Sequence, residues 1–374
     1  MPANPRSAAR RLSQFLSGAL GRPLAPSDLP VDQSEWEKIL RISSVHLAAP
    51  QLRWALREQG LFSHLPDDVA DYLDAIYTLN VDRNIKCEDQ LAHLISALNS
   101  VAVHPVLLKG AAAIVGGLYP TSGERIISDL DILVPAEALP EIVDKMADLG
   151  YQPRLTEGMD IPDPVHFAGH HHYPKLISPD WTTYVELHLH PVNLNFVDLL
   201  TADEILLDAT ALQWRDGQCR LPSPTHFITH NIIHALLVNT QYKFERLSLR
   251  QLFEFVLASQ AYSGRIDWDG IRNRFDRLGH GKALRQYLAL ASTCLDFHAP
   301  AEIAIDDRAR KSIRPYLFHL DLQNRAALWT IHLVQQVRDI LRPLKKRPVK
   351  TVRKIFSVNT RTRVINKIRA GPKN

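Results

Sequence analysis

Hydrophobic positions recur every three to four residues through residues 34–100 and again after Pro222. This spacing places apolar side chains on one face of an amphipathic helix. Gly60 and Pro66 interrupt the first region and predict separate helices on either side of them. Helices are therefore predicted before and after the centre of the chain, the later ones over 224–241, 246–262 and 325–344.

The centre of the chain follows a different pattern. A short apolar run at 106–108 predicts a buried strand, which turns at Gly110 into a helix of small residues. The run ISDLDILV predicts a second strand, ended by Pro135, and an amphipathic helix follows that Gly150 closes. Residues 181–190 alternate between apolar and polar and predict a third, half-buried strand. Strands alternating with helices are typical of an α/β-like core.

The sequence therefore predicts an α+β protein with four parts. Residues 1–100 are expected to form an N-terminal helical segment, 101–200 the core, 201–344 a C-terminal helical domain and 345–374 a tail. The 374 residues, 45% of them hydrophobic, are enough to bury a substantial core.

Neither a membrane span nor a disulfide framework is predicted. No apolar stretch reaches the roughly 18 residues that a transmembrane helix needs, and the start of the chain has no signal-peptide core. We therefore expect a cytoplasmic protein. Cys87, Cys219 and Cys294 are far apart in the sequence and have no metal-binding spacing, which favours buried free thiols.

Charge is distributed unevenly. The net charge is +4, but residues 345–374 hold eleven Lys or Arg and no acid, so the first 344 residues carry 4 − 11 = −7. Apolar residues at helical spacing in this tail predict a basic amphipathic helix, which suits an anionic membrane surface. A single aromatic, Phe356, gives it little capacity to stack on nucleic-acid bases. Docking of the tail on the acidic body is equally compatible with the pattern.

Two aspartates in the second predicted strand carry the chemistry. Asp129 and Asp131 are two residues apart, so their side chains point to the same side of a strand. Paired carboxylates repel each other unless a cation lies between them, and Mg²⁺ is commonly held by one or two carboxylates plus substrate phosphates. Glu186 lies on the polar face of the third strand and is the candidate third ligand. A pair of magnesium ions can assist in-line displacement at phosphorus.

Cationic groups stand nearby in the sequence. Lys109 and Gly110 follow the first strand and open a helix, where backbone N–H groups favour phosphate. Lys109 supplies a point charge and Arg125 a forked one, both suited to triphosphate oxygens. His188 shares the face of Glu186, where it could orient that carboxylate or contact a phosphate.

Several of these segments together resemble the uncharacterised nucleotidyltransferase family of the polymerase-beta-like superfamily. They are LLKGAAAI, RIISDLDILV, HHHYPKL, VELHLHP and, further on, PTHFITHNIIHALL and LRQLFEF. The resemblance implies a small mixed sheet flanked by helices, with Asp129, Asp131 and Glu186 as metal ligands and Lys109, Gly110 and Arg125 at the family's phosphate-binding positions. Glu254 stands where an aspartate is expected.

The predicted function is therefore magnesium-dependent transfer of a nucleoside monophosphate from a nucleoside triphosphate to an acceptor hydroxyl. One alternative is a phosphoesterase that binds a metal through its histidines, although His230 and His234 in HNIIH lack the glutamate of an HExxH motif. For His166, His170 and His230 a hydrogen-bonded, partly buried side chain is favoured. Another alternative is a nucleotide-binding protein without catalysis. The sequence specifies neither the nucleotide, the acceptor nor the oligomeric state.

Overall fold

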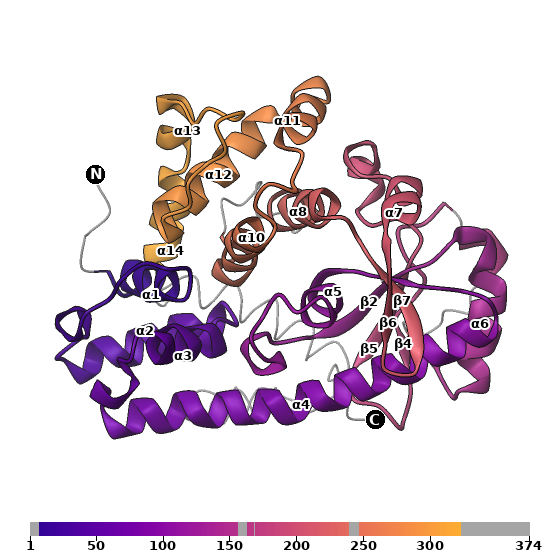
Figure 1. Cartoon of the computed structure of the whole chain (residues 1–374), viewed down its shortest axis with the longest axis horizontal. Helices are drawn as coiled ribbons and strands as arrows, with labels where there is room; N and C mark the ends of the chain where they lie inside the picture. Colours follow the sequence, from indigo (N-terminus) through magenta and orange to yellow (C-terminus); the bar gives the residue numbers. More distant parts are fainter. Residues whose placement is uncertain (1–6, 156–162, 168, 239–246, 323–374) are drawn as a thin grey trace, which may run out of the picture.

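The computed structural model describes residues 7–155, 163–167, 169–238 and 247–322. It is a mixed helix and sheet structure in which helical segments flank one sheet (Figure 1). Within these residues no helix is both long and apolar enough to cross a membrane. The predicted helix over 325–344 and the basic tail lie outside the described residues.

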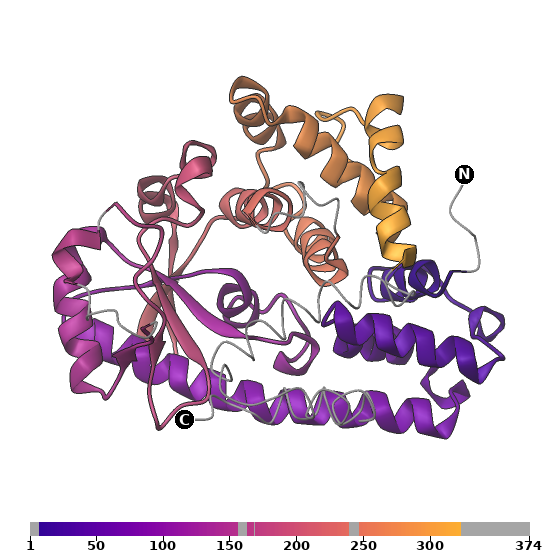
Figure 2. The ribbon, with the colours of Figure 1, turned by 180° about the vertical axis from the view of Figure 1, so that it is seen from behind.

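The N-terminal helices follow the predicted pattern, with breaks at Gly60 and Pro66. Gly60 has φ +67°, a left-handed conformation that ends a helix at low cost for glycine. The last helix, α4, is 34 residues long and runs beside both the other N-terminal helices and the sheet (Figures 1 and 2). The four helices are α1 (Ala8–Gly18), α2 (Gln33–Val45), α3 (Ala49–Glu58) and α4 (Asp67–Ser100).

In the described part of the chain, seven strands form one mixed sheet in the order β3-β4-β5-β2-β1-β7-β6. The central strands β2 and β5 run parallel, and β1 is antiparallel to β2. The strands are β1 (Val106–Leu107), β2 (Asp129–Leu133), β3 (Gln152–Pro153), β4 (Leu176–Ile177), β5 (Tyr184–His188), β6 (Thr210–Trp214) and β7 (Gly217–Leu221).

The three predicted strands are confirmed as β1, β2 and β5, but β5 is not half buried as expected. Glu186 is 7% exposed and His188 is fully buried, although both lie on the polar face. The prediction was wrong because polar side chains from other elements, and not solvent, cover this face. On the opposite face Gln90 of α4 donates a hydrogen bond to the carbonyl of Thr183 (2.9 Å), which ties α4 to the start of β5.

Strands β6 and β7 were not predicted, and they extend the sheet into the region expected to be helical. They form a hairpin whose residues are mostly exposed or half-buried, so their sequence has no clear apolar alternation. Arg215 in the turn has φ +51°, a left-handed conformation that favours glycine or asparagine, and the Asp-Gly pair typical of hairpin turns stands one residue later, at Asp216 and Gly217. The four-part division of the chain stays a prediction.

The remaining helices cover the sheet and build the C-terminal part. The predicted small-residue and amphipathic helices are confirmed as α5 and α6, and Gly150 follows α6 at φ +76°. All three cysteines are buried free thiols, as expected. The helices are α5 (Lys109–Val115), α6 (Leu139–Asp148), α7 (Ala202–Asp208), α8 (Pro224–Ile232), a π-helix (Ile233–Val238), α10 (Leu249–Ala261), α11 (Trp268–Arg277), α12 (Gly281–Leu295), α13 (Asp307–Ser312) and α14 (Arg314–Leu322).

Candidate active site

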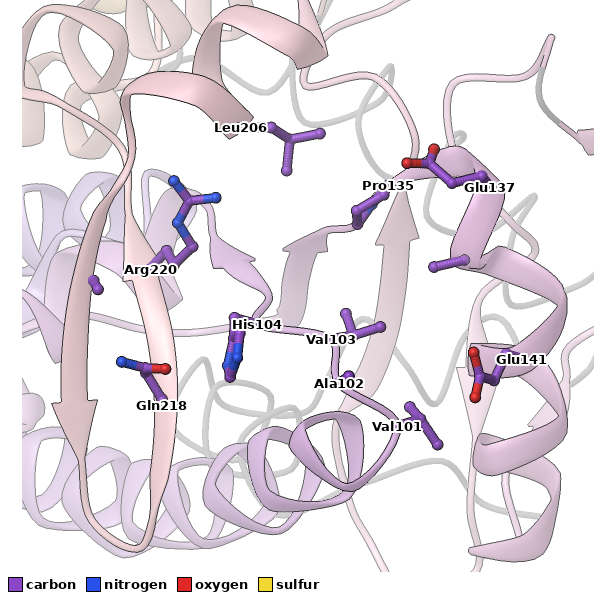
Figure 3. Close-up of a pocket in the computed structure, with 12 residues that line it drawn as sticks. Val101, Ala102, Val103, His104, Pro135, Glu137, Glu141, Leu206, Gln218 and Arg220 are labelled. Carbon is purple, nitrogen blue, oxygen red and sulfur yellow. The ribbon is translucent and has the colours of Figure 1, made fainter.

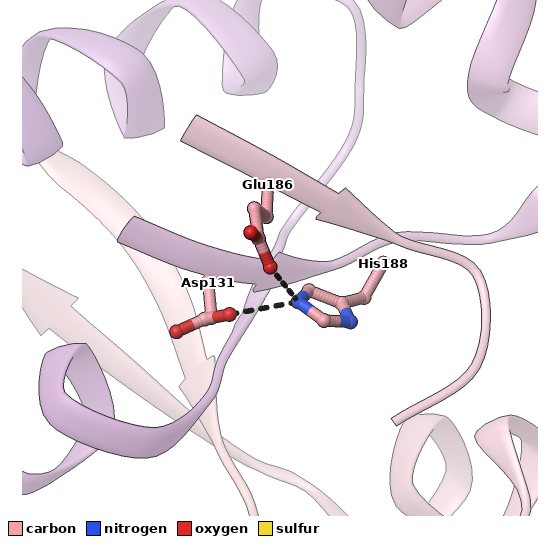
Figure 4. Close-up of side chains that lie close together, drawn as sticks. All are labelled: Asp131, Glu186 and His188. Atoms are coloured by element: carbon pink, nitrogen blue, oxygen red, sulfur yellow. Dashed lines mark hydrogen bonds and ion pairs between the residues drawn. The ribbon is translucent and has the colours of Figure 1, made fainter. Parts of the chain in front are cut away.

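Register between β2 and β5 brings the acidic side chains together. The strands pair in parallel with Asp131 opposite Glu186 and Leu133 opposite His188. Because alternate residues of a strand share a face, Asp131, Glu186 and His188 all project to one side of the sheet, where Figure 4 shows them converging. Asp129 projects to the same side, at the start of β2.

His188 joins the two buried carboxylates. Its Nε2 lies 2.8 Å from Oδ1 of Asp131 and 3.3 Å from Oε2 of Glu186 (Figure 4). One ligand atom from each of the three residues lies within 4.8 Å of the others, and within the described residues this is the set that could hold a metal ion. Two carboxylates and one imidazole form a donor set compatible with a divalent cation.

Two lysines pair with the carboxylates. Lys109 Nζ lies 2.6 Å from Oδ1 of Asp131. Lys175 Nζ lies 3.3 Å from Oδ2 of Asp129 and also forms an ion pair with Glu186. A divalent cation that enters must therefore compete with both ammonium groups for the carboxylate oxygens.

Lys175 was not singled out from the sequence. It precedes β4, and the antiparallel pairing of Leu176 with Val185 is what places it beside Glu186. No spacing rule connects a lysine before a two-residue strand to an acid eleven positions later. The only sequence signal was its position inside the segment HHHYPKL, which resembles the family.

The ion pairs hold the carboxylates in their charged form. Burial alone would raise the pKa of Glu186, but hydrogen bonds from His188 and Lys175 outweigh it and lower that pKa to about 2. Burial opposes ionisation of Asp131 in the same way, and Lys109 with His188 still holds its pKa well below the usual range. Burial and Lys109 would lower the pKa of His188, but its carboxylate partners raise it.

The turn after β1 places Lys109 in an unusual backbone conformation. Lys109 has φ +49°, in the left-handed region that costs a non-glycine residue about 1 kcal/mol or more. This conformation accompanies the ion pair of Lys109 with Asp131 in β2. The strain therefore lies at the residue that joins the turn to the carboxylates.

Gly110 and Arg125 lie against each other beside this turn. A Cβ on Gly110 would lie 3.3 Å from Nη2 of Arg125, so the absence of a side chain lets the guanidinium pack closely on the backbone. Arg125 is 5% exposed, and its Nε donates to Oε2 of Glu254 in α10. Tyr119 donates to the same oxygen over 3.2 Å. The arginine predicted as a phosphate ligand is thus also bound to the C-terminal helices.

The other histidines surround this site without joining the metal set. The rings of His171 and His172 lie 5.0 and 5.6 Å from that of His188, whereas His170 packs on Phe167. Burial, together with the charge of Lys109, lowers the pKa of His230 to about 3, so it is neutral at neutral pH. Among the described residues only one histidine belongs to a set able to hold a metal, which gives the histidine-based phosphoesterase no support.

A separate cavity of about 630 Å³ lies at the other end of the central strands (Figure 3). Val103 and His104, before β1, and Pro135, after β2, line it, whereas the carboxylates lie where β2 begins. Glu137 and Glu141 face it from one side. No residue predicted for the site lines this cavity.

Comparison with known proteins bears on the same region. Residues 32–296 match the model of a family described as uncharacterised nucleotidyltransferase. The match includes β2 and β5, the turn at Lys109 and helix α10. No curated protein and no solved structure matches the chain.

Proposed function

The chain belongs to this nucleotidyltransferase family, and we propose that it transfers a nucleoside monophosphate from a nucleoside triphosphate to an acceptor hydroxyl with the help of magnesium. The acceptor oxygen forms a bond to the α-phosphorus, the bond between the α-phosphorus and its bridging oxygen breaks, and pyrophosphate leaves with the electron pair. The proton of the hydroxyl is released.

The observation that carries this proposal is the convergence of Asp129, Asp131 and Glu186 across two parallel strands. Their oxygen atoms would hold one or two magnesium ions, and His188 would orient Asp131 and Glu186 through Nε2. When bound, magnesium polarises the phosphate and favours the deprotonated acceptor. Their pKa values keep Asp131 and Glu186 ionised at neutral pH, ready for a cation.

The cationic residues have a second role in this proposal. Lys109 and Lys175 pair with carboxylate oxygens, and both ammonium groups would also suit the oxygens of a triphosphate. Arg125 lies against Gly110 at the edge of the same turn. Together they would neutralise the negative charge that gathers on pyrophosphate as it leaves.

The test is release of pyrophosphate from each of the four nucleoside triphosphates with Mg²⁺ and cell extract as the source of acceptor. Mass spectrometry then searches the products for the added nucleotide. Transfer by the wild type, and none by an Asp129→Ala variant that still melts cooperatively, would support the proposal. Full activity of Asp129→Ala would refute the mechanism. If the protein binds nucleoside triphosphate but releases no pyrophosphate from it with any acceptor, only the non-catalytic alternative remains.

A further inference from the structure

Helix α10 turns a charged face toward the turn that carries Gly110. Arg250 and Glu254 are four residues apart, so their side chains lie one above the other on one face of the helix. Glu254 on that face bonds to Arg125 and Tyr119. Arg250 lies close enough for its charge to influence the pKa of Glu254, Tyr119 and His234.

Arg250 has no partner among the described residues. Its Nε is sealed from solvent and makes no hydrogen bond, and the neighbouring carboxylate of Glu254 forms its ion pair with Arg125. Burial and the charge of Arg125 lower the pKa of Arg250 to about 10, so the guanidinium remains charged at neutral pH. Two arginines thus share one carboxylate, which leaves one surplus positive charge.

Arg250 is half-buried with its Nε sealed from solvent, and an uncompensated charge in such a place is costly. The nearby acids do not compensate this charge. Asp129 accepts a hydrogen bond from Ser128 over 2.9 Å and pairs with Lys175, and Asp131 pairs with Lys109. No acid of the described residues thus forms an ion pair with Arg250, and a bound anion would compensate its charge.

The surroundings restrict what that anion can be. The charge of Asp129 influences the pKa of Arg250, so the two groups lie within electrostatic range. An anion bound at Arg250 without a metal ion would therefore be repelled by the carboxylates. A phosphate chain bound together with magnesium would not meet this repulsion, because the cation would offset the charge of the acids. The planar fork of arginine matches phosphate oxygens in pairs.

We propose that Arg250 binds the phosphate chain of the nucleoside triphosphate, so that α10 supplies the anion-binding side of a site whose metal-binding side lies on β2 and β5. This assignment rests on the proposed function for the identity of the anion. Arg125 is engaged by Glu254 beside the turn at Gly110, whereas Arg250 adds a guanidinium with no partner among the described residues.

The experiment compares Arg250→Met with the wild type and with Arg265→Met, which removes an exposed arginine just after α10. Methionine keeps much of the aliphatic length of Arg250 and removes its charge. Calorimetry measures binding of each nucleoside triphosphate and of inorganic triphosphate, all with Mg²⁺. Thermal unfolding without ligand is the second readout. Loss of a purely structural arginine lowers the melting temperature, whereas loss of a ligand-binding arginine does not.

We expect Arg250→Met to bind nucleoside triphosphate at least tenfold more weakly than the wild type, with Arg265→Met unchanged. Without ligand, Arg250→Met should melt at the wild-type temperature or above it, since it removes an uncompensated charge. A lower melting temperature together with unchanged affinity would overturn the assignment and indicate a structural role.

The two proposals fail in different ways. If Arg250→Met binds nucleoside triphosphate as tightly as the wild type does, the role of Arg250 is refuted and nucleotidyl transfer stands. If the wild type binds inorganic triphosphate through Arg250 but binds no nucleoside triphosphate, nucleotidyl transfer is refuted and the anion site stands. If the wild type binds neither, Arg250 is not a phosphate ligand.

Discussion

Two groups of buried charge lie within electrostatic reach of each other, and they are balanced differently. In the carboxylate cluster, Asp129, Asp131 and Glu186 are matched by Lys109, Lys175 and His188. In the arginine cluster, one carboxylate, Glu254, is shared by Arg125 and Arg250.

The difference indicates what each cluster is suited to bind. In the carboxylate cluster the ammonium groups of Lys109 and Lys175 pair with the acids, and the Lys175 side chain is 41% exposed. The arginine cluster holds two guanidinium groups beside one carboxylate, so under our proposal an anion completes it. Under our proposal, a magnesium complex of a triphosphate would satisfy both clusters at once.

The strongest test of the carboxylate cluster is Asp131→Asn, which keeps the shape of the side chain and removes its charge. We expect transfer to fall by about 10³-fold or more, because magnesium loses a central ligand. Pyrophosphate release measures the effect, and thermal unfolding verifies that the variant is folded. Asp144→Asn, on an exposed position of α6, is the matched control. Activity within tenfold of the wild type would mean that Asp131 is not a metal ligand.

The arginine cluster is tested by breaking its ion pair from one side. Arg125→Met leaves the buried Glu254 without its closest partner and should lower the free energy of unfolding by about 3 kcal/mol. The double variant Arg125→Met, Glu254→Met should recover part of that loss, because no unpaired carboxylate remains. Urea unfolding of the four proteins in the cycle measures the coupling. Additive losses would mean that Arg125 and Glu254 stabilise the fold independently.

Replacing Lys175 tests whether an ammonium group holds a position that a metal can take. In Lys175→Met, magnesium no longer competes for Asp129 and Glu186, so metal affinity without nucleotide should rise by about threefold to tenfold, near 1 kcal/mol. The half-exposed position of Lys175 keeps the effect small. Calorimetric titration with Mg²⁺ measures it, with Lys86→Met on an exposed turn of α4 as control. Weaker magnesium binding would show that Lys175 supports the metal site and does not compete with it.

Local patterns predicted the central fold and much of the site. The alternation in β5 and the spacing of Asp129 and Asp131 follow from the geometry of a single strand, which a sequence displays directly. The β6–β7 hairpin was missed because exposed strands need no apolar alternation.

Contacts between distant segments could not be predicted. Lys175 reaches Glu186 only through strand pairing, and Glu254 reaches Arg125 across 129 positions. That Arg250 has no partner among the described residues is visible only once the partners of the neighbouring acids are known. Charge balance, unlike periodicity, is a property of the folded site.

The smallest expected effect comes from an ion pair at the protein surface. Its contribution to stability is a reference for the ion pairs of the two clusters described above. Glu204 of α7 pairs with Arg274 of α11, and its Oε2 accepts hydrogen bonds from the backbone N–H and the hydroxyl of Thr201, the residue that caps α7. Burial opposes its ionisation, but Arg274 and Thr201 lower the pKa of Glu204 to about 2 from an ordinary value of 4.5. The side chain is 34% exposed, so solvent screening reduces the contribution to about 1 kcal/mol.

Because the pKa of Glu204 is lower in the folded state, its contribution is complete above pH 4.5 and disappears as the pH falls through about 2. Glutamine at this position still accepts the capping hydrogen bond, so Glu204→Gln isolates the charge. Urea unfolding should show the variant about 1 kcal/mol less stable than the wild type at pH 6, with the gap closing between pH 4.5 and 2. Glu58→Gln, at an exposed position in α3, is the control. A gap that is the same at pH 6 and pH 2.5 would mean that the carboxylate acts through packing, and that charge pairing at this surface contributes nothing.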